Sequence, residues 1–257
     1  MKPMILKEKT TKWLAEAGAL VLQMMQHGFS GELKADDTPV TAIDHAVEQL
    51  LRERIQAAFP EHGIIGEESE SYQPDAEYCW VIDPIDGTRA LLAGFASFTI
   101  LVALSHRGLP HFGAIYQPIT KELWMGIVGE KSTLADSTIS TRNCEKLSNA
   151  FFSTTSPLLF KPEQRATIEA IIQQCVAYQF GGDAYAYAKL ASGRIDLIIE
   201  SGLKPHDFMA LAPVIQGAGG IITDWQGKAL HLGSAGEICA AGDTRIHQKA
   251  LAILSKL

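Results

Sequence analysis

The segment Trp80-Val81-Ile82-Asp83-Pro84-Ile85-Asp86-Gly87-Thr88-Arg89-Ala90 is the one around which the rest of this chain can be arranged. Its apolar beginning predicts a buried strand, and two carboxylates, Asp83 and Asp86, follow at the strand's end. A short helix is expected next, over residues 88–93, with Gly94 ending it. Carboxylate oxygens suit Mg²⁺, and the N–H groups at the beginning of a helix suit phosphate. This combination indicates a metal-dependent enzyme acting on a phosphate ester.

Composition limits the classes of protein that fit. The chain has 257 residues, of which 47% are hydrophobic, so it can bury a large core as one compact unit or as two sub-domains. The formal net charge of −7 argues against a nucleic-acid partner. An acidic protein that handles an anionic substrate needs cations between the two, which fits a metal site. No stretch approaches the ~18 apolar residues of a membrane helix, so no membrane partner is expected.

Cysteine usage and the N-terminal sequence predict the compartment. The four cysteines are far apart and form no Cys-x-x-Cys pair, which is typical of buried free thiols in a reducing compartment. Three lysines interrupt any apolar run near the N-terminus, so no secretory pattern is present. We therefore expect a soluble cytoplasmic protein. The cysteines are Cys79, Cys144, Cys175 and Cys239, and the lysines are Lys7, Lys9 and Lys12.

Hydrophobic spacing predicts the elements of the first half of the chain. Helices are expected over 4–27 and 42–59, the second with Thr41 as its N-cap and Asp44 completing a variant capping box. A polar loop is expected between them, at 31–39. The strands expected after the second helix are 63–66, 79–82 and an antiparallel meander of 98–104, 112–116 and 123–128.

From about residue 150 strands alternate with helices. The expected strands are 151–154, 195–199, 220–223 and 237–241, and the expected helices are 163–174, 184–191, 208–217 and 244–255. This change predicts a boundary near residue 145. Residues 1–145 would form an N-terminal α+β sub-domain with most metal ligands, and 146–257 a C-terminal α/β sub-domain with Asp207 and the substrate contacts.

Three acidic groups stand at strand ends or beside helix beginnings. They are Glu67, the pair Asp83 and Asp86, and Asp207. Each also has an ordinary structural explanation: a solvated loop residue, a turn residue before Pro or Gly, and an N-cap. Their spacing alone does not show that the three groups converge.

Taken together, three motifs resemble the inositol monophosphatase family. They are Gly66-Glu67-Glu68-Ser69, Asp83-Pro84-Ile85-Asp86-Gly87-Thr88, and the segment 204–220, which ends in Gln216-Gly217-Ala218-Gly219-Gly220. The resemblance covers essentially the whole chain. It implies an α+β fold, a layered αβαβα sandwich of the type shared with fructose-1,6-bisphosphatase. It also implies a Mg²⁺-dependent phosphomonoesterase with a small phosphorylated substrate, and a homodimer.

Several details are more similar to the histidinol-phosphate phosphatase branch of this family. Arg89-Ala90-Leu91 follows the hexapeptide where the inositol branch usually shows Thr-Asn, and His206 precedes Asp207 where that branch usually has Trp. The segments 34–41, 154–157 and 181–187 also look like this branch. L-histidinol phosphate is therefore the expected substrate. The alternative activities are a phosphatase of inositol-1-phosphate or of a broader range of sugar phosphates, and a 3′-phosphoadenosine nucleotidase. An alternative of another class is a non-catalytic regulator that binds metal and phosphate.

The resemblance implies the metal ligands residue by residue. Glu67, Asp83 and the carbonyl of Ile85 would hold one Mg²⁺. Asp83, Asp86 and Asp207 would hold a second, with Asp83 bridging the two. A third, weaker ion would lie near Glu67 and Asp44.

The resemblance also implies the catalytic and substrate-binding roles. Glu67 and Thr88 would orient or deprotonate the attacking water, with Asp44 in the same catalytic group. The phosphate would lie against Gly87 and Thr88, near Asp86 and Asp207. The other expected substrate contacts are Arg89, Asp183 and Glu200, the last two for the alcohol part or an ammonium group. A surface ion pair or a helix cap is the alternative for each of these three. The eight histidines show no metal-ligand spacing, so His206 is expected to be a structural neighbour only.

Overall fold

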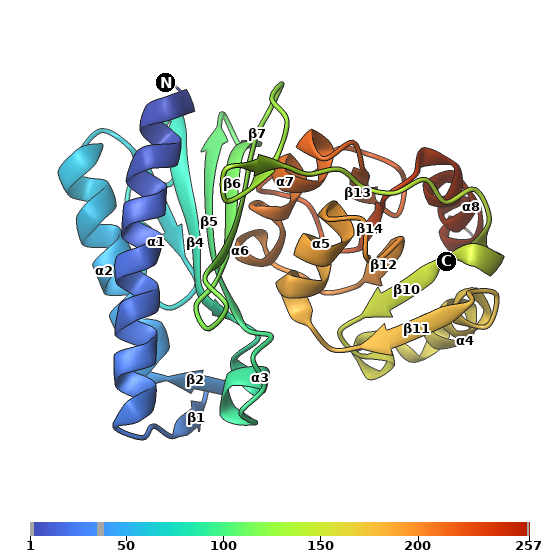
Figure 1. The fold of residues 1–257 in the computed structure, drawn as a ribbon, viewed down its shortest axis with the longest axis horizontal. Helices are drawn as coiled ribbons and strands as arrows, with labels where there is room; N and C mark the ends of the chain where they lie inside the picture. The colour runs from blue at the N-terminus through green and yellow to red at the C-terminus, as the bar shows by residue number, and fades with distance from the viewer. Residues whose placement is uncertain (1–2, 35–38, 256) are drawn as a thin grey trace.

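The computed structural model describes residues 3–34, 39–255 and 257. Its elements form five layers in the order αβαβα, as Figure 1 shows from the N-terminal helices to the C-terminal one. Three clusters of buried apolar residues fill the spaces between the layers. The layered α+β sandwich expected from the sequence is therefore confirmed.

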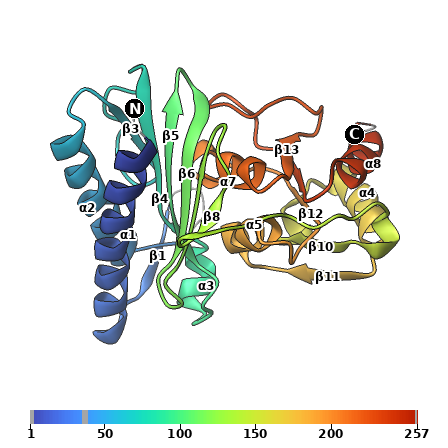
Figure 2. The same cartoon turned by 45° about the horizontal axis from the view of Figure 1, so that its top comes forward.

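The first two layers are a helix pair and a seven-stranded sheet. α1 (Pro3–Gln26) and α2 (Ala42–Ala58) cover one face of this sheet, which Figure 2 shows from a second angle. Thr41 caps α2, and the side chain of Asp44 completes the expected capping box. The strands, in their order across the sheet, are β3 (Gly63–Gly66), β4 (Tyr78–Asp86), β5 (Thr99–His106), β6 (Leu109–Gln117), β7 (Glu122–Ile127), β8 (Thr133–Leu134) and β9 (Ser137–Thr138).

The side chains of β4 alternate between the two faces of the large sheet. Trp80 and Ile82 belong to the cluster under α1 and α2, whereas Val81 belongs to the cluster on the opposite face. Because side chains of a strand alternate with a period of two, Asp83 lies on the same face as Val81. The first carboxylate of the signature therefore faces the central helices of the sandwich.

The remaining layers come from the C-terminal half. α5 (Asp183–Ala191), α6 (Pro205–Phe208) and α7 (Leu211–Gly217) lie between the sheets, and α4 (Pro162–Ile172) and α8 (Thr244–Leu254) cover the outer face of the second sheet. This sheet has the order β11 (Ala177–Phe180), β10 (Phe151–Thr154), β12 (Leu197–Glu200), β14 (Ile238–Ala241) and β13 (Ile221–Asp224). Two 3₁₀ turns, η1 (Leu147–Asn149) and η2 (Pro157–Leu159), flank β10. The sub-domain boundary near residue 145 remains a prediction.

Three expectations about elements were wrong. The segment 31–39 is not simply a loop, because β1 (Gly31–Leu33) and β2 (Pro39–Thr41) pair antiparallel there. The helix expected over 208–217 is divided into α6 and α7, since Pro213 has no N–H to donate to the preceding turn. The edge strand β11 was missed because its side chains lie at the surface and give no burial pattern.

The structure also bears on the expectations about the cysteines and about membrane-spanning helices. All four cysteines are free, but Cys175 is only half-buried, since it lies beyond the end of α4. Within the described part of the chain, no helix is long and apolar enough to span a membrane.

Candidate active site

The strand β4 delivers two aspartates to the same place by means of a bulge. Asp83 pairs with Leu101 of β5, and Asp86 pairs with Thr99. Between these two pairs β4 advances by three residues and β5 by two, so β4 contains one extra residue. Pro84 has no N–H for the ladder, which is why the extra residue falls here. In a regular strand residues three apart point to opposite faces. The bulge instead allows the side chains of Asp83 and Asp86 to converge.

Glu67 and Asp207 reach the same point from two other elements. β3 pairs parallel with β4, with Gly66 opposite Ile82, so Glu67 follows directly beside Asp83. Asp207 lies in α6, where its Oδ2 accepts a hydrogen bond from the backbone N–H of Lys204 at 2.6 Å. Asp207 is thus not the N-cap that was its alternative role, because Lys204 is the N-cap and Asp207 is the third residue of the helix. Its hydrogen bond to the N-cap N–H does not compete with a role in the site.

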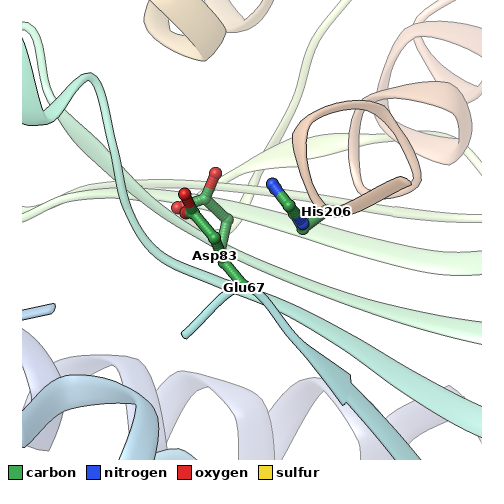
Figure 3. A group of neighbouring side chains, drawn as sticks. All are labelled: Glu67, Asp83 and His206. Carbon is green, nitrogen blue, oxygen red and sulfur yellow. The ribbon is translucent and has the colours of Figure 1, made fainter. Parts of the chain in front are cut away.

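Two overlapping sets of donor atoms result. One atom from each of Asp83, Asp86 and Asp207 lies within 4.8 Å of the others, and so does one atom from each of Glu67, Asp83 and His206. Figure 3 shows the second set. Asp83 belongs to both sets, and its bridging of two ions stays a prediction. The convergence that sequence spacing could not establish is present in the structure.

The carboxylates of these donor sets lie close together and are largely buried, so their negative charges repel one another. Asp83 is 1% exposed, and burial raises its pKa well above the ordinary value, with further increases from the negative charges of Glu67, Asp86 and Asp207. Removal from water likewise raises the pKa of Asp86 and of Asp207. Several carboxylate oxygens close together suit a divalent cation, whose positive charge would reduce the repulsion between them. The residues could therefore hold a metal ion.

Lys34 already provides one positive charge at the edge of the site. Its Nζ lies 2.8 Å from Oε1 of Glu67 and 2.6 Å from Oε1 of Glu68. Burial by itself would lower the pKa of Lys34, but the hydrogen bonds to the two glutamates raise it above the ordinary value. Sequence analysis missed this contact, because it placed Lys34 in a polar loop and in a branch motif but gave it no partner. Residues 35–38, part of the segment 34–41 that suggested the family branch, lie outside the described residues.

Thr88 is held in place by two acceptors. Its Oγ1 lies 3.0 Å from the carbonyl oxygen of Ile85 and 3.2 Å from Oδ1 of Asp44. Asp44 is fully buried, and its other oxygen accepts hydrogen bonds from the N–H and the hydroxyl of Thr41. Burial raises the pKa of Asp44. Asp44 thus lies behind Thr88 and supports it, and hydrogen bonds occupy both of its oxygens.

A cavity of about 180 Å³ opens above these groups. Gly87, at φ +87°, is the N-cap of the short helix α3 (Thr88–Leu92), so the backbone turns at the floor of the cavity without a side chain. The cavity is lined by Pro39, Glu67, Asp83, Ile85, Asp86, Gly87, Thr88, Arg89, Asp183 and Asp207. Every expected metal ligand borders it, and Arg89 stands exposed at its rim.

The two acids expected to contact the alcohol part face a second, smaller cavity of about 150 Å³, which Asp86 and Asp207 also border. Asp183 is the first residue of α5. The next residue, Ala184, donates its backbone N–H to Oδ2 of Asp86 at 2.6 Å. Glu200, at the end of β12, is 2% exposed. Burial raises the pKa of Glu200 to about 7 and also raises the pKa of Asp183. The structure brings both acids beside the metal ligands.

His206 is the residue of the site that sequence analysis rejected. It precedes Asp207 on α6, and the donor set with Glu67 and Asp83 includes one of its ring nitrogens. Its partners come from distant parts of the sequence, so no His-containing spacing could have revealed it. Only its position next to a candidate ligand was a signal.

Comparisons with known proteins show which family the chain resembles. The sequence profile described as the inositol monophosphatase family matches residues 6–257. A bifunctional phosphatase of Arabidopsis thaliana, IMPL2, chloroplastic, is 44% identical over 93% of this chain and 72% of its own length. A histidinol-phosphatase of Chlorobaculum parvum is 29% identical over 80% of each chain.

Solved structures show the same similarity. An inositol monophosphatase from Zymomonas mobilis superposes with a TM-score of 0.84 at 38% identity, covering 96% of this chain and 98% of that one. The structure of an inositol monophosphatase from Anabaena gives a TM-score of 0.86 at 27% identity, covering 99% and 96%. With its fold, its carboxylate cluster and these relatives, the chain belongs to the inositol monophosphatase family and is a phosphoric monoester hydrolase.

Proposed function

We propose that this enzyme is a Mg²⁺-dependent phosphatase that hydrolyses L-histidinol phosphate to L-histidinol and inorganic phosphate. The observation that carries the substrate assignment is the pair of acids beside the phosphate cavity. Glu200 accepts hydrogen bonds from the N–H of Thr155 at 2.6 Å and from the hydroxyl of Thr154 at 3.2 Å, and no described lysine or arginine forms an ion pair with it. Asp183 lines the same cavity.

An ammonium group would compensate this negative charge. Arg89 borders the same cavity and its charge already acts on Asp183, whereas Glu200 has no such cation. A buried carboxylate without a cationic partner is costly, so a ligand that brings a positive charge to Glu200 gains affinity there. L-Histidinol phosphate has an ammonium group close to its phosphate ester, whereas inositol-1-phosphate offers only hydroxyls. The histidinol-phosphatase among the relatives supports the same choice.

The metal ligands divide into two groups around Asp83. Glu67, Asp83 and the carbonyl of Ile85 would hold one Mg²⁺, and Asp83, Asp86 and Asp207 a second. Bound divalent ions supply a more acidic water and stabilise the leaving oxygen. A third, weaker ion would lie near Glu67 and Asp44, and both oxygens of Asp44 already accept hydrogen bonds from Thr41 and Thr88.

The protein's own groups orient the reactants. The Thr88 hydroxyl, fixed by Asp44 and by the Ile85 carbonyl, would align the attacking water together with Glu67. The backbone N–H groups of Gly87 and Thr88 would hold phosphate oxygens at the beginning of α3. Water would attack phosphorus in line, so the chain needs no nucleophilic side chain.

Hydrolysis of inositol-1-phosphate is the second candidate. The 38% identical structure from Zymomonas mobilis carries that name, and hydroxyls of a polyol could also donate to Asp183 and Glu200. A broader range of sugar phosphates fits the same chemistry. A regulatory role without catalysis fits less well, because a regulator has no need of the complete set of Glu67, Asp83, Asp86 and Asp207.

The test is phosphate release from both substrates by the purified protein, with Mg²⁺ and with a chelator. Faster Mg²⁺-dependent release from L-histidinol phosphate supports the proposal. A preference for inositol-1-phosphate would replace it with the second candidate. No release from any monoester would favour the regulatory role. We also expect a homodimer, to be checked by light scattering.

A further inference from the structure

We propose that His206 is a nitrogen ligand of the metal position formed by Glu67 and Asp83, and that it gives this position a preference for Zn²⁺ and similar first-row ions over Mg²⁺. The inference rests on the metal site of the proposed function. It concerns a residue that the expected set of oxygen ligands does not include.

The geometry places a ring nitrogen within reach of an ion. Figure 3 shows a nitrogen of His206 pointing toward the carboxylate oxygens of Glu67 and Asp83. The three donor atoms lie within 4.8 Å of one another. When each ligand atom lies about 2.1 Å from an ion, the ligand atoms lie about 3 to 4.2 Å from one another. A small adjustment of these three side chains would therefore complete the coordination.

The His206 ring has one charged neighbour on its own helix, Asp207, which lies at ion-pair distance. Its side chain is only 11% exposed, yet no hydrogen bond joins the ring to a described residue. Nε2 lies 3.6 Å from Oδ1 of Asp207, which is too long for a hydrogen bond. A metal ion that binds this ring therefore has no hydrogen bond of the ring to displace.

The donor types make the two metal positions different. Asp83, Asp86 and Asp207 offer oxygen only, which suits Mg²⁺. The position with His206 offers one nitrogen beside two carboxylates, and imidazole is a good ligand for zinc, iron and nickel. The same pair of sites is therefore expected to bind two kinds of ion with different affinity.

The experiment measures metal affinity rather than turnover. Dissociation constants for Zn²⁺ and Mg²⁺ are determined by competition with a chromophoric chelator and by calorimetry, for the wild type, His206→Gln and His206→Phe. The matched control is His27→Gln, since His27 is exposed and its Nδ1 contacts only the carbonyl of Gln23. Thermal melts show that each variant is folded.

We expect both His206 variants to bind Zn²⁺ at least about tenfold more weakly, with Mg²⁺ affinity changed less than about threefold and the control unchanged. In Mn²⁺-loaded protein, pulsed EPR is expected to detect nitrogen coupling that disappears in His206→Phe. Unchanged Zn²⁺ affinity, or equal losses for both metals, would overturn the inference. Phosphate release from the same wild-type sample tests the proposed function separately, because it can succeed while the histidine result fails.

Discussion

Gly87 and Asp183 are packed so closely that a methyl group on Gly87 would lie 3.0 Å from Oδ2 of Asp183. Gly87 belongs to the phosphate side of the site and Asp183 to the side proposed for the amine. The bare Cα of Gly87 therefore lets the two sides meet, and this close approach explains why glycine is required here beyond its φ of +87°.

Gly87→Ala is expected to impair both stability and substrate selection. The positive φ costs about 1–2 kcal/mol for a residue with a Cβ, and the methyl group also displaces the Asp183 carboxylate. Gly94→Ala is the matched control, because Gly94 has φ +79° but nothing within 4 Å of the added methyl group. Urea unfolding should show a stability loss in both variants, larger in Gly87→Ala because only there does the methyl group meet close neighbours, and kcat/KM for L-histidinol phosphate measures the effect on activity. Activity should fall only in Gly87→Ala; an equal fall in both would contradict the role of this contact.

Asp83→Asn should remove activity without unfolding the protein. The substitution keeps the shape of a buried side chain and removes a charge that repels Glu67, Asp86 and Asp207, so the metal-free protein should be at least as stable as the wild type. Loss of the bridging ligand should lower Mg²⁺-dependent kcat/KM by roughly a hundredfold or more. Asp136→Asn, at an exposed position, is the control. Near wild-type turnover of Asp83→Asn at low Mg²⁺ would refute the two-metal assignment.

Glu200 should make the stability of the metal-free protein depend on pH. Its pKa rises from 4.5 in the unfolded chain to about 7 in the folded one, so the folded state binds more protons between these values. The contribution of Glu200 to stability is therefore fully present below pH 4.5 and is lost as pH rises to about 7, by about 3 kcal/mol. The raised pKa values of Asp83, Asp86 and Asp207 act in the same direction.

Glu200→Gln isolates this contribution. The amide keeps a carbonyl for the N–H of Thr155 but no longer titrates, so its free energy of unfolding should fall less steeply between pH 4.5 and 7. Urea unfolding of both proteins at several pH values, with a chelator present, measures the difference. Parallel curves would show that Glu200 does not titrate in this range.

The sequence predicted the parts of the site that depend on local chemistry. The continuous apolar run before Asp83, the proline at position 84 and the capping box of Thr41 and Asp44 are all encoded within a few residues. They were sufficient for the central strand and the second helix, whereas the full set of expected ligands came from the family resemblance.

What the sequence could not provide depends on packing between distant segments. The nearness of His206 to Glu67 follows from the position of α6 across the face of β4, and the contact of Lys34 with Glu67 follows from the pairing of β1 with β2. The strand β11 is at an edge, with Tyr178 and Phe180 exposed, so no alternation marks it. Such features have no local signal to detect.

The most direct test of the account is kcat/KM with Mg²⁺ for L-histidinol phosphate and inositol-1-phosphate, measured side by side on the same preparation. If Glu200 and Asp183 bind an ammonium group, L-histidinol phosphate should be preferred by roughly a hundredfold, which corresponds to about 2.7 kcal/mol of transition-state discrimination. That preference should shrink in Glu200→Gln. Comparable low values for the two substrates, or a preference for inositol-1-phosphate, would contradict the assignment.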